Sequence, residues 1–369
     1  MSQSLAFKKL LNGLKSEASE VRGNPVLGWT CTYLPLEILD AAGLSSYRIL
    51  PETSSERADA YLDPNFCPFI KASLGKVLEG EYSFLSGIVM LNTCDGMRRL
   101  YDAWRFYCHP PFSFLLDLPR IVTSSSIAFF REGLVDLIGK IERHFGVTVT
   151  KDGLASAIEE ANRTRALIRR LFSSQGRGDP PLRHSDILDI LAEGWTNQRK
   201  VFNKALDHFL AKLEVDSSVV SRGPKLMVTG SLLDGSLLIR LIEELGGEVV
   251  ASDLCIGERF LDGVILGSDP VLSLSKAYLE KAPCARMYDT ERRILHLKHE
   301  LDKTKAGGVI YFALKFCDPY LYEAPAAEEA LRRIGVPTLF IEGEYTGRIS
   351  GGTRTRVQAF LEILGRDAG

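Results

Sequence analysis

A chain of 369 residues is too long for one ordinary hydrophobic core, so we expect two domains of typical size. The apolar fraction of 45% and the charged fraction of 25% are typical of globular proteins and argue against a disordered or membrane-embedded chain. Because 45 Lys and Arg residues nearly balance 47 Asp and Glu residues, no broad basic surface is expected, which argues against a nucleic-acid partner.

The N-terminal segment, residues 1–20, has the apolar spacing of an amphipathic helix. It lacks the apolar core and the cleavage site of a signal peptide, and no run of about 18 apolar residues follows anywhere. The sequence therefore predicts a cytoplasmic chain that does not enter a membrane. In a reducing cytosol its seven cysteines should persist as core residues, catalytic groups or metal ligands rather than as disulfides.

The first α/β domain is predicted over residues 1–125 and begins with the amphipathic helix. Its apolar runs at residues 46–50, 86–92 and 112–118 alternate with helical patterns and are bounded by Gly, Pro or Asp. Short apolar runs of this kind are typical of the buried strands of a parallel sheet.

A helical segment is predicted over residues 126–221, where helical periodicity continues without strand-like runs. The second α/β domain is predicted over residues 222–369. Its predicted strands lie at residues 225–230, 247–253, 307–314 and 336–343. The predicted fold class is therefore α/β, with two parallel-sheet domains on either side of a helical segment.

The two α/β domains share a sequence pattern that indicates a duplicated βα unit. Residues 86–104 and 307–325 both contain an apolar strand, then Cys-Asp, then a helical pattern. Upstream of each lies a cysteine that is next to Pro and opens a predicted helix, Cys67 in the first half and Cys284 in the second. The pattern predicts a pseudo-repeat whose two halves face one cleft.

The cysteines occur at the boundaries of predicted elements. Cys94 and Cys317 directly follow strands, and ligands of parallel sheets lie beyond the carboxyl ends of the strands. Four more cysteines occupy comparable loop or helix-start positions, namely Cys31, Cys67, Cys255 and Cys284. We predict that these six are metal ligands at the cleft, although each alone could be a small core residue. Cys108, which has no counterpart in the second half, is predicted to be structural.

Spacing alone does not identify the metal. The chain has no CxxC pair, no ferredoxin run and no zinc-ribbon pattern, and thiolate ligands suit either an iron–sulfur cluster or zinc. The chain also has no GxGxxG after a strand and no Walker A sequence, so we expect that it does not hydrolyse ATP itself.

Several segments resemble one known family. They are GWTCTYLPLEILDAAG, NTCDGMRRLYDAW, ASDLCIGERF, LKFCDPYLYE and GGTRTRVQAFLEIL. From about residue 22 to its end, the chain resembles the 2-hydroxyacyl-CoA dehydratase and benzoyl-CoA reductase superfamily. The resemblance implies two Rossmann-like domains with a [4Fe–4S] cluster between them, held by residues that match Cys67, Cys94 and Cys317.

The additional cysteines resemble those of the double-cubane cluster proteins within this superfamily. Under this resemblance, Cys31, Cys255 and Cys284 would complete the ligands of an [8Fe–9S] cluster. The resemblance also implies oxygen sensitivity, a separate ATP-dependent iron–sulfur activator that supplies low-potential electrons, and a homodimer or a heterodimer with a homologous subunit. The substrate would be an acyl-CoA or another small molecule.

Three further residues are candidates for the site. Glu37 lies in a helix that Pro35 could open and is the candidate acid–base group, although it could equally be an ordinary first-turn carboxylate. Arg354 and Arg356 open the last predicted helix after two glycines, an arrangement that suits anions such as the phosphates of CoA. Salt bridges within the fold would explain them as well.

Three alternatives to a double-cubane reductase remain open. The first is a subunit of a 2-hydroxyacyl-CoA dehydratase or benzoyl-CoA reductase with one [4Fe–4S] cluster. The second is an electron carrier without catalytic activity, and the third is a structural zinc protein, which would be colourless and stable in air.

Overall fold

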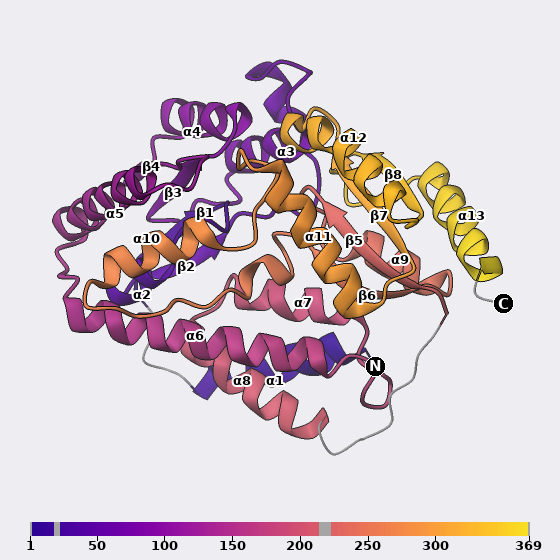
Figure 1. Cartoon of the computed structure of the whole chain (residues 1–369). Coiled ribbons are helices and arrows are strands. Elements are labelled where there is room, and N and C mark those ends of the chain that lie inside the picture. Colours follow the sequence, from indigo (N-terminus) through magenta and orange to yellow (C-terminus); the bar gives the residue numbers. More distant parts are fainter. Residues whose placement is uncertain (1, 18–22, 214–222, 368–369) are drawn as a thin grey trace.

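The computed structural model describes residues 2–17, 23–213 and 223–367 (Figure 1). It contains two four-stranded sheets, with strand orders β2-β1-β3-β4 and β6-β5-β7-β8. Every strand pair in both sheets is parallel. The structure thus confirms the α/β class with two Rossmann-like parallel-sheet domains, and both sheets have the same order of strands along the chain.

The first sheet and its helices occupy the N-terminal part of the chain. The strands are β1 (Val26–Trp29), β2 (Ser45–Arg48), β3 (Gly87–Asn92) and β4 (Ser113–Asp117). The helices are α2 (Glu37–Ala41), the 3₁₀ helix η2 (Glu56–Ala60), α3 (Pro68–Leu78) and α4 (Asp95–Cys108). Three of the four strands were predicted, with boundaries that differ by one or two residues.

Strand β1 was missed, although it lies in the middle of the sheet between β2 and β3. It has only four residues, and Gly28 interrupts its apolar pattern. The structure explains the glycine, because a Cβ at this position would lie 2.7 Å from Leu85 Cδ1 and 2.9 Å from Ile49 Cδ1. Glycine in a strand often marks such a close approach, and it weakened the strand pattern in the sequence.

The second sheet and its helices occupy the C-terminal part. The strands are β5 (Lys225–Gly230), β6 (Glu248–Asp253), β7 (Gly308–Leu314) and β8 (Thr338–Gly343). The helices are α9 (Leu237–Glu244), η3 (Glu258–Phe260), α10 (Pro270–Glu280), α11 (Thr290–Thr304), α12 (Asp318–Arg333) and α13 (Gly351–Asp367). All seven residues of β7 are buried, as expected for a central strand that is covered on both faces.

The remaining helices are α1 (Gln3–Glu17), α5 (Ser124–Phe145), α6 (Lys151–Ser173), α7 (His184–Gly194) and α8 (Arg199–Leu213). In Figure 1, α1, α6, α7 and α8 form a layer beneath the sheets, whereas α5 lies beside the first sheet and packs on β4 and α10. Helix α1 packs on α7 and α8, where Phe7 lies edge-on to Phe202 and Phe209. No helix among the described residues is long and apolar enough to cross a membrane. The predicted domain boundary at residue 125 stays a prediction, and the predicted boundary at residues 221 and 222 lies outside the described residues.

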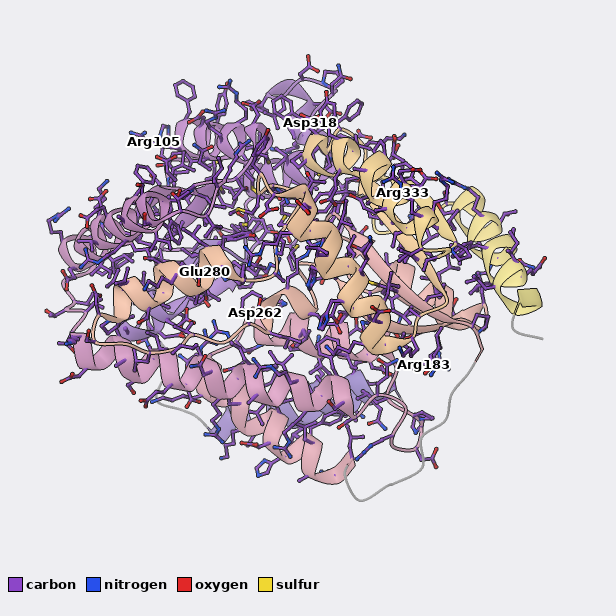
Figure 2. The ribbon with its side chains drawn as sticks, in the orientation of Figure 1. Arg105, Arg183, Asp262, Glu280, Asp318 and Arg333 are labelled. Carbon is purple, nitrogen blue, oxygen red and sulfur yellow. The ribbon has the colours of Figure 1, made fainter. Side chains whose placement is uncertain are left out.

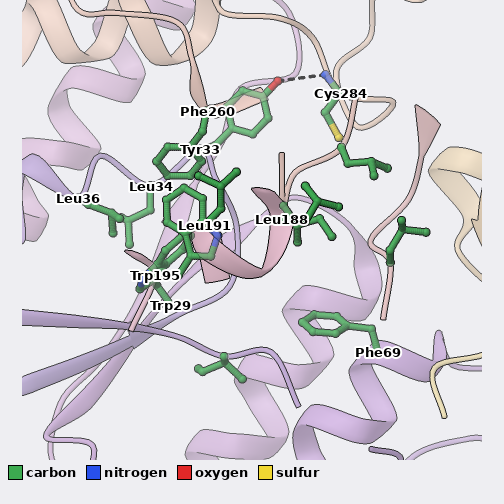
Figure 3. Close-up of a cluster of buried hydrophobic side chains, with 14 of the residues drawn as sticks. Trp29, Tyr33, Leu34, Leu36, Phe69, Leu188, Leu191, Trp195, Phe260 and Cys284 are labelled. Carbon is green, nitrogen blue, oxygen red and sulfur yellow. Dashed lines mark hydrogen bonds between the residues drawn. The ribbon is translucent and has the colours of Figure 1, made fainter. Parts of the chain in front are cut away.

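The two sheets and the helical layer share one hydrophobic core. Trp29 of β1 lies edge-on to Trp195, which follows α7, and the ring centroids are 6.1 Å apart. Trp195 also packs on Phe260 of the second half at 4.1 Å between ring centroids. Because Trp29, Trp195 and Phe260 come from all three parts and meet here (Figure 3), the relative position of the two halves is fixed by packing. Figure 2 shows that side chains fill the space between the ribbons of these parts.

Candidate functional site

Three cysteines occupy the same position relative to a helix. Cys67 precedes α3, Cys94 precedes α4 and Cys317 precedes α12, in each case as the N-cap residue. None of the three side chains accepts a capping hydrogen bond. A helix N-terminus carries a partial positive charge and unpaired N–H groups, so each position favours a thiolate or another anion.

These three cysteines line one cavity of about 200 Å³ together with Arg286. Cys67 and Cys94 come from the first half, whereas Cys317 and Arg286 come from the second. A hydrogen bond with the Cys317 thiol lowers the pKa of Cys67 below its ordinary value. The cavity is therefore the predicted cleft between the halves, and thiols from both sides meet in it.

The backbone before Cys317 is unusual. Phe316, which also lines the cavity, has a φ of 56°, in the left-handed region that bulky residues rarely adopt. Such conformations persist where the surrounding structure imposes them, and they are common at functional sites. Here the turn between β7 and α12 places Cys317 at the cavity.

Cys31 and Cys284 lie close to Arg286, which also lines this cavity. Arg286 Nη1 lies 3.6 Å from the Sγ atom of Cys284, and the hydroxyl of Tyr320 lies 3.1 Å from the same sulfur. Burial alone would raise the pKa of Cys284, but the Arg286 and Arg259 guanidiniums outweigh it and lower the pKa to about 7. Burial raises the pKa of Cys31, and the charge of Arg286 acts against this increase.

The backbone of Cys284 is held by the first half of the molecule. Its N–H group donates a hydrogen bond of 3.3 Å to the hydroxyl of Tyr33, which follows two residues after Cys31 (Figure 3). This contact ties the loop after β1 to the loop after α10. The structure therefore brings Cys31, Cys284 and the first three cysteines into one region around Arg286.

Cys255 lies after β6 and faces Arg48, the last residue of β2. Arg48 Nη1 donates to the carbonyl oxygen of Cys255 at 2.8 Å, and Arg48 Nη2 donates to its Sγ atom at 3.4 Å. No hydrogen bond among the described residues joins Cys255 to another cysteine. Its part in a shared site stays a prediction.

A buried network of charged side chains holds Tyr320, the residue that contacts the sulfur of Cys284. Arg259 binds both carboxylate oxygens of Asp253, each at 2.8 Å, and it also donates to the hydroxyl of Tyr320. Arg293 pairs with the same Asp253 and with Glu323. The positive charges of Arg259 and Arg293 hold the pKa of Asp253 well below its ordinary value. Arg259 also contacts the hydroxyl of Tyr320, which lies against the sulfur of Cys284.

The donor set of this region fits an iron–sulfur cluster. Within the part of the chain that the structure describes, no three His, Cys, Asp or Glu side chains are close enough to enclose a single metal ion. A cubane is larger than one ion, so its thiolate ligands surround it at greater separation. Cysteine sulfurs, three helix N-termini and a guanidinium around one cavity match the ligand chemistry and the negative charge of such a cluster.

Glu37 is fully buried, and none of the hydrogen bonds of the described residues joins its carboxylate to a cysteine. Its carboxylate accepts hydrogen bonds from Arg165 Nη2 at 2.7 Å and from the Tyr278 hydroxyl at 2.8 Å. Burial would raise the pKa of Glu37, but the nearby Arg165 and Arg199 guanidiniums lower it below its ordinary value. The ionised carboxylate joins α2, α6 and α10, and its acid–base role stays a prediction.

The Glu37→Gln variant should test whether this carboxylate is structural. The substitution leaves the Arg165 guanidinium buried without a counter-charge, so we expect a loss of about 3–5 kcal/mol in the free energy of unfolding, measured by denaturant titration. The control is Glu328→Gln, which replaces an exposed carboxylate. Its free energy of unfolding should stay within about 0.5 kcal/mol of the wild-type value. Lost activity with unchanged stability would instead support the acid–base role.

Arg354 and Arg356 lie in the first turns of α13, both exposed. Arg356 Nη2 donates to the carbonyl oxygen of Phe340 at 2.6 Å. A separate cavity of about 500 Å³ at the carboxyl edge of the second sheet is lined by Arg348 and Thr353 but not by these two arginines. Their contact with an anion therefore stays a prediction.

The residues that sequence analysis missed are Arg48, Arg286 and Tyr320. Arg48 was hidden within a predicted strand, and Arg286 follows Cys284 by two residues without a known ligand pattern. Tyr320 follows Cys317 by three residues on α12 and contacts Cys284 of a distant segment. Only the tertiary structure brings these side chains to cysteines.

Known proteins similar to this chain are dehydratase and reductase subunits. The model of the 2-hydroxyglutaryl-CoA dehydratase D-component family matches residues 31–364. The chain is 28% identical to an Escherichia coli K12 protein named as a dehydratase subunit, YjiM, over 93% of this chain and 92% of that protein. It is 22% identical to the (R)-phenyllactyl-CoA dehydratase beta subunit of Clostridium sporogenes, over 94% and 93% of the two chains. It is 25% identical to a benzoyl-CoA reductase subunit of Thauera aromatica, over 88% and 87%.

Proposed function

This chain belongs to the 2-hydroxyglutaryl-CoA dehydratase D-component family, as its motifs predicted, and on that premise we propose that it is an iron–sulfur enzyme of the reductase or dehydratase type. It receives low-potential electrons on a cluster in the cleft between its halves and uses them to reduce a small substrate. The relatives are named as subunits of enzymes, which favours catalysis over a role as an electron carrier alone.

The main support for this proposal is that Cys67, Cys94 and Cys317 line one cavity. These residues would hold the first cubane, each from the N-terminus of a helix. A bound cluster of this kind supplies one-electron chemistry at a potential that depends on charge, hydrogen bonds and burial. The protein supplies thiolates from both halves, three helix dipoles and the adjacent Arg286 guanidinium.

We further propose that the cluster is of the double-cubane type. Cys284 and Cys31 lie near Arg286, beside the first three cysteines, and would hold the second cubane together with Cys255. The lowered pKa of Cys284, about 7, favours the thiolate that iron binds. A single [4Fe–4S] cluster held by the first three cysteines alone is the second candidate.

The proposed partners follow from the relatives and from the sequence. The similar proteins are each named as one subunit of an enzyme, which supports a homologous partner subunit. We also propose a separate ATP-dependent activator, as the resemblance to the double-cubane proteins and dehydratases implies, and the lack of a Walker A motif in this sequence is compatible with it. The protein would work in the cytoplasm without oxygen, as a homodimer or heterodimer.

The iron and acid-labile sulfide contents of protein purified without oxygen test this proposal. We expect about eight irons per chain and a decrease in both the Cys255→Ser and the Cys284→Ser variants, because each would lose a thiolate ligand. The variant Cys108→Ser, at the end of α4, is the matched control and should keep the full content. About four irons, unchanged in both variants, would support the single-cluster candidate. Iron-free wild-type protein would refute both candidates.

A further inference from the structure

Buried arginines in this protein normally have a carboxylate partner. Four arginines of the described chain are nearly inaccessible to solvent: Arg48, Arg165, Arg259 and Arg293. Three of them form ion pairs. Arg165 pairs with Glu37, and Arg259 pairs with Asp253. Arg293 pairs with both Asp253 and Glu323. Arg48 has no carboxylate within ion-pair distance among the described residues, so its charge is balanced in another way.

Arg48 is enclosed by aromatic rings and one cysteine. Its guanidinium carbon lies 5.0 Å from the ring centroid of Trp29 and 5.6 Å from that of Trp195. Its side chain is 1% exposed, its Nε atom has no hydrogen-bond partner, and its two Nη atoms donate to the carbonyl oxygen and the sulfur of Cys255. The sulfur is thus the single group among these partners that can carry a negative charge.

Arg286 also lies beside cysteines and an aromatic ring. It lines the cavity with Cys67, Cys94 and Cys317, and its Nη1 atom lies 3.6 Å from the sulfur of Cys284. Its guanidinium carbon lies 5.7 Å from the ring centroid of Tyr320, and its Nε atom is buried without a partner. No carboxylate of the described residues pairs with it.

A buried guanidinium without an anion is costly, because an uncompensated buried charge destabilises a protein by several kcal/mol. This cost applies most strongly to Arg48, which is almost fully buried, whereas Arg286 is half-buried. Each of the two guanidiniums is directed at a cysteine sulfur, which indicates that negative charge belongs at these sulfurs. Thiolates that bind an iron–sulfur cluster carry this charge, and each added electron increases it. A fixed positive charge nearby stabilises the reduced form more than the oxidised form.

We propose that Arg48 and Arg286 are the fixed counter-charges of the cluster, and that they raise its reduction potential so that the electron from the activator is retained. They are positioning residues that act through Cys255 and Cys284 and do not ligate iron. This inference rests on the proposed iron–sulfur function and assigns the electrostatic control of that site to two arginines.

The test is an EPR-monitored redox titration of oxygen-free protein, with iron measured in the same samples. The variants are Arg286→Gln and Arg48→Gln, which remove the charge, and Arg286→Lys and Arg48→Lys, which keep it. We expect the midpoint potential to move to more negative values in the Gln variants and to move less in the Lys variants. The control is Arg240→Gln, which removes a charge that pairs with Asp189 at the surface and should leave the potential unchanged.

Each outcome decides the inference. An unchanged potential in Gln variants that keep their iron would overturn it and leave the proposed function intact, whereas iron-free wild-type protein would refute the function itself. Loss of iron in the Gln variants but not in the Lys variants would also support a requirement for charge. Loss of iron in both kinds of variant would indicate a purely structural role. If Arg48→Gln does not fold, the half-buried Arg286 decides the question alone.

Discussion

Replacement of Cys317 by Ala is expected to abolish activity and to remove the first cubane, which is about half of the iron of a double-cubane protein and all of the iron of a single-cluster protein. Cys317 supplies the thiol of the second half to the cavity that Cys67 and Cys94 line from the first half, and no other cysteine of the described residues lines that cavity. The substitution removes one of the three proposed thiolate ligands of the first cubane, so we expect that cubane to be lost. Iron, acid-labile sulfide and the EPR signal of the reduced protein measure the loss.

The Cys108→Ala variant is the matched control for this experiment. Cys108 is a partly buried cysteine at the end of α4, and it does not line the cavity. Its substitution should leave the iron content unchanged. A Cys317→Ala protein with the full iron content would show that the cluster is held elsewhere, and the cavity would lose its proposed role.

The second large effect is a loss of stability in mild acid that originates at His184. This residue begins α7, is fully buried, and bonds through Nε2 to Ser252 of β6 at 2.7 Å and through Nδ1 to Gln175 at 3.0 Å. Burial lowers its pKa from 6.5 to about 3. The folded protein therefore holds the neutral imidazole, whereas the unfolded chain binds a proton below pH 6.5.

Because the unfolded state binds more protons, stability decreases as the pH falls through the window between 6.5 and about 3. One group whose pKa is 6.5 in the unfolded chain and about 3 in the folded protein implies a loss of about 2 kcal/mol between pH 7 and pH 5. Denaturant titrations at both pH values measure it in the wild type and in a His184→Gln variant. The variant lacks the titrating group, so its decrease should be smaller by about 2 kcal/mol. Equal decreases in the two proteins would refute the assignment to His184.

The construction of the fold explains why the proposed cluster lies where it does. Each sheet ends its third strand in sequence, β3 or β7, with a short turn that leads to a cysteine and then a helix. The pseudo-repeat therefore places Cys94 and Cys317 at corresponding positions, and Trp29, Trp195 and Phe260 hold the two halves together. The cavity between the halves is built from two copies of one βα unit and a third helix, α3.

The sequence by itself determined the fold class, the family and the cysteine positions. Runs such as residues 307–314 are apolar over their whole length because central parallel strands are buried on both faces, and that signal is local. The Cys-Asp pairs after two of these runs placed thiols at the carboxyl ends of strands, which a parallel sheet turns toward its ligand site. Each of these inferences depends on neighbours within one element.

The tertiary structure alone decided which charges meet. Arg48 and Cys255 are separated by 207 positions in the chain, and Glu37 and Arg165 by 128, so no local pattern links them. Glu37 looked like a candidate acid–base group in the sequence, and the structure shows it as the partner of a buried guanidinium. Strand β1 was missed because the glycine that permits its close packing also weakens its apolar pattern. Periodicity reports what one element buries, whereas the balance of buried charge is set by contacts between elements that only the folded chain brings together.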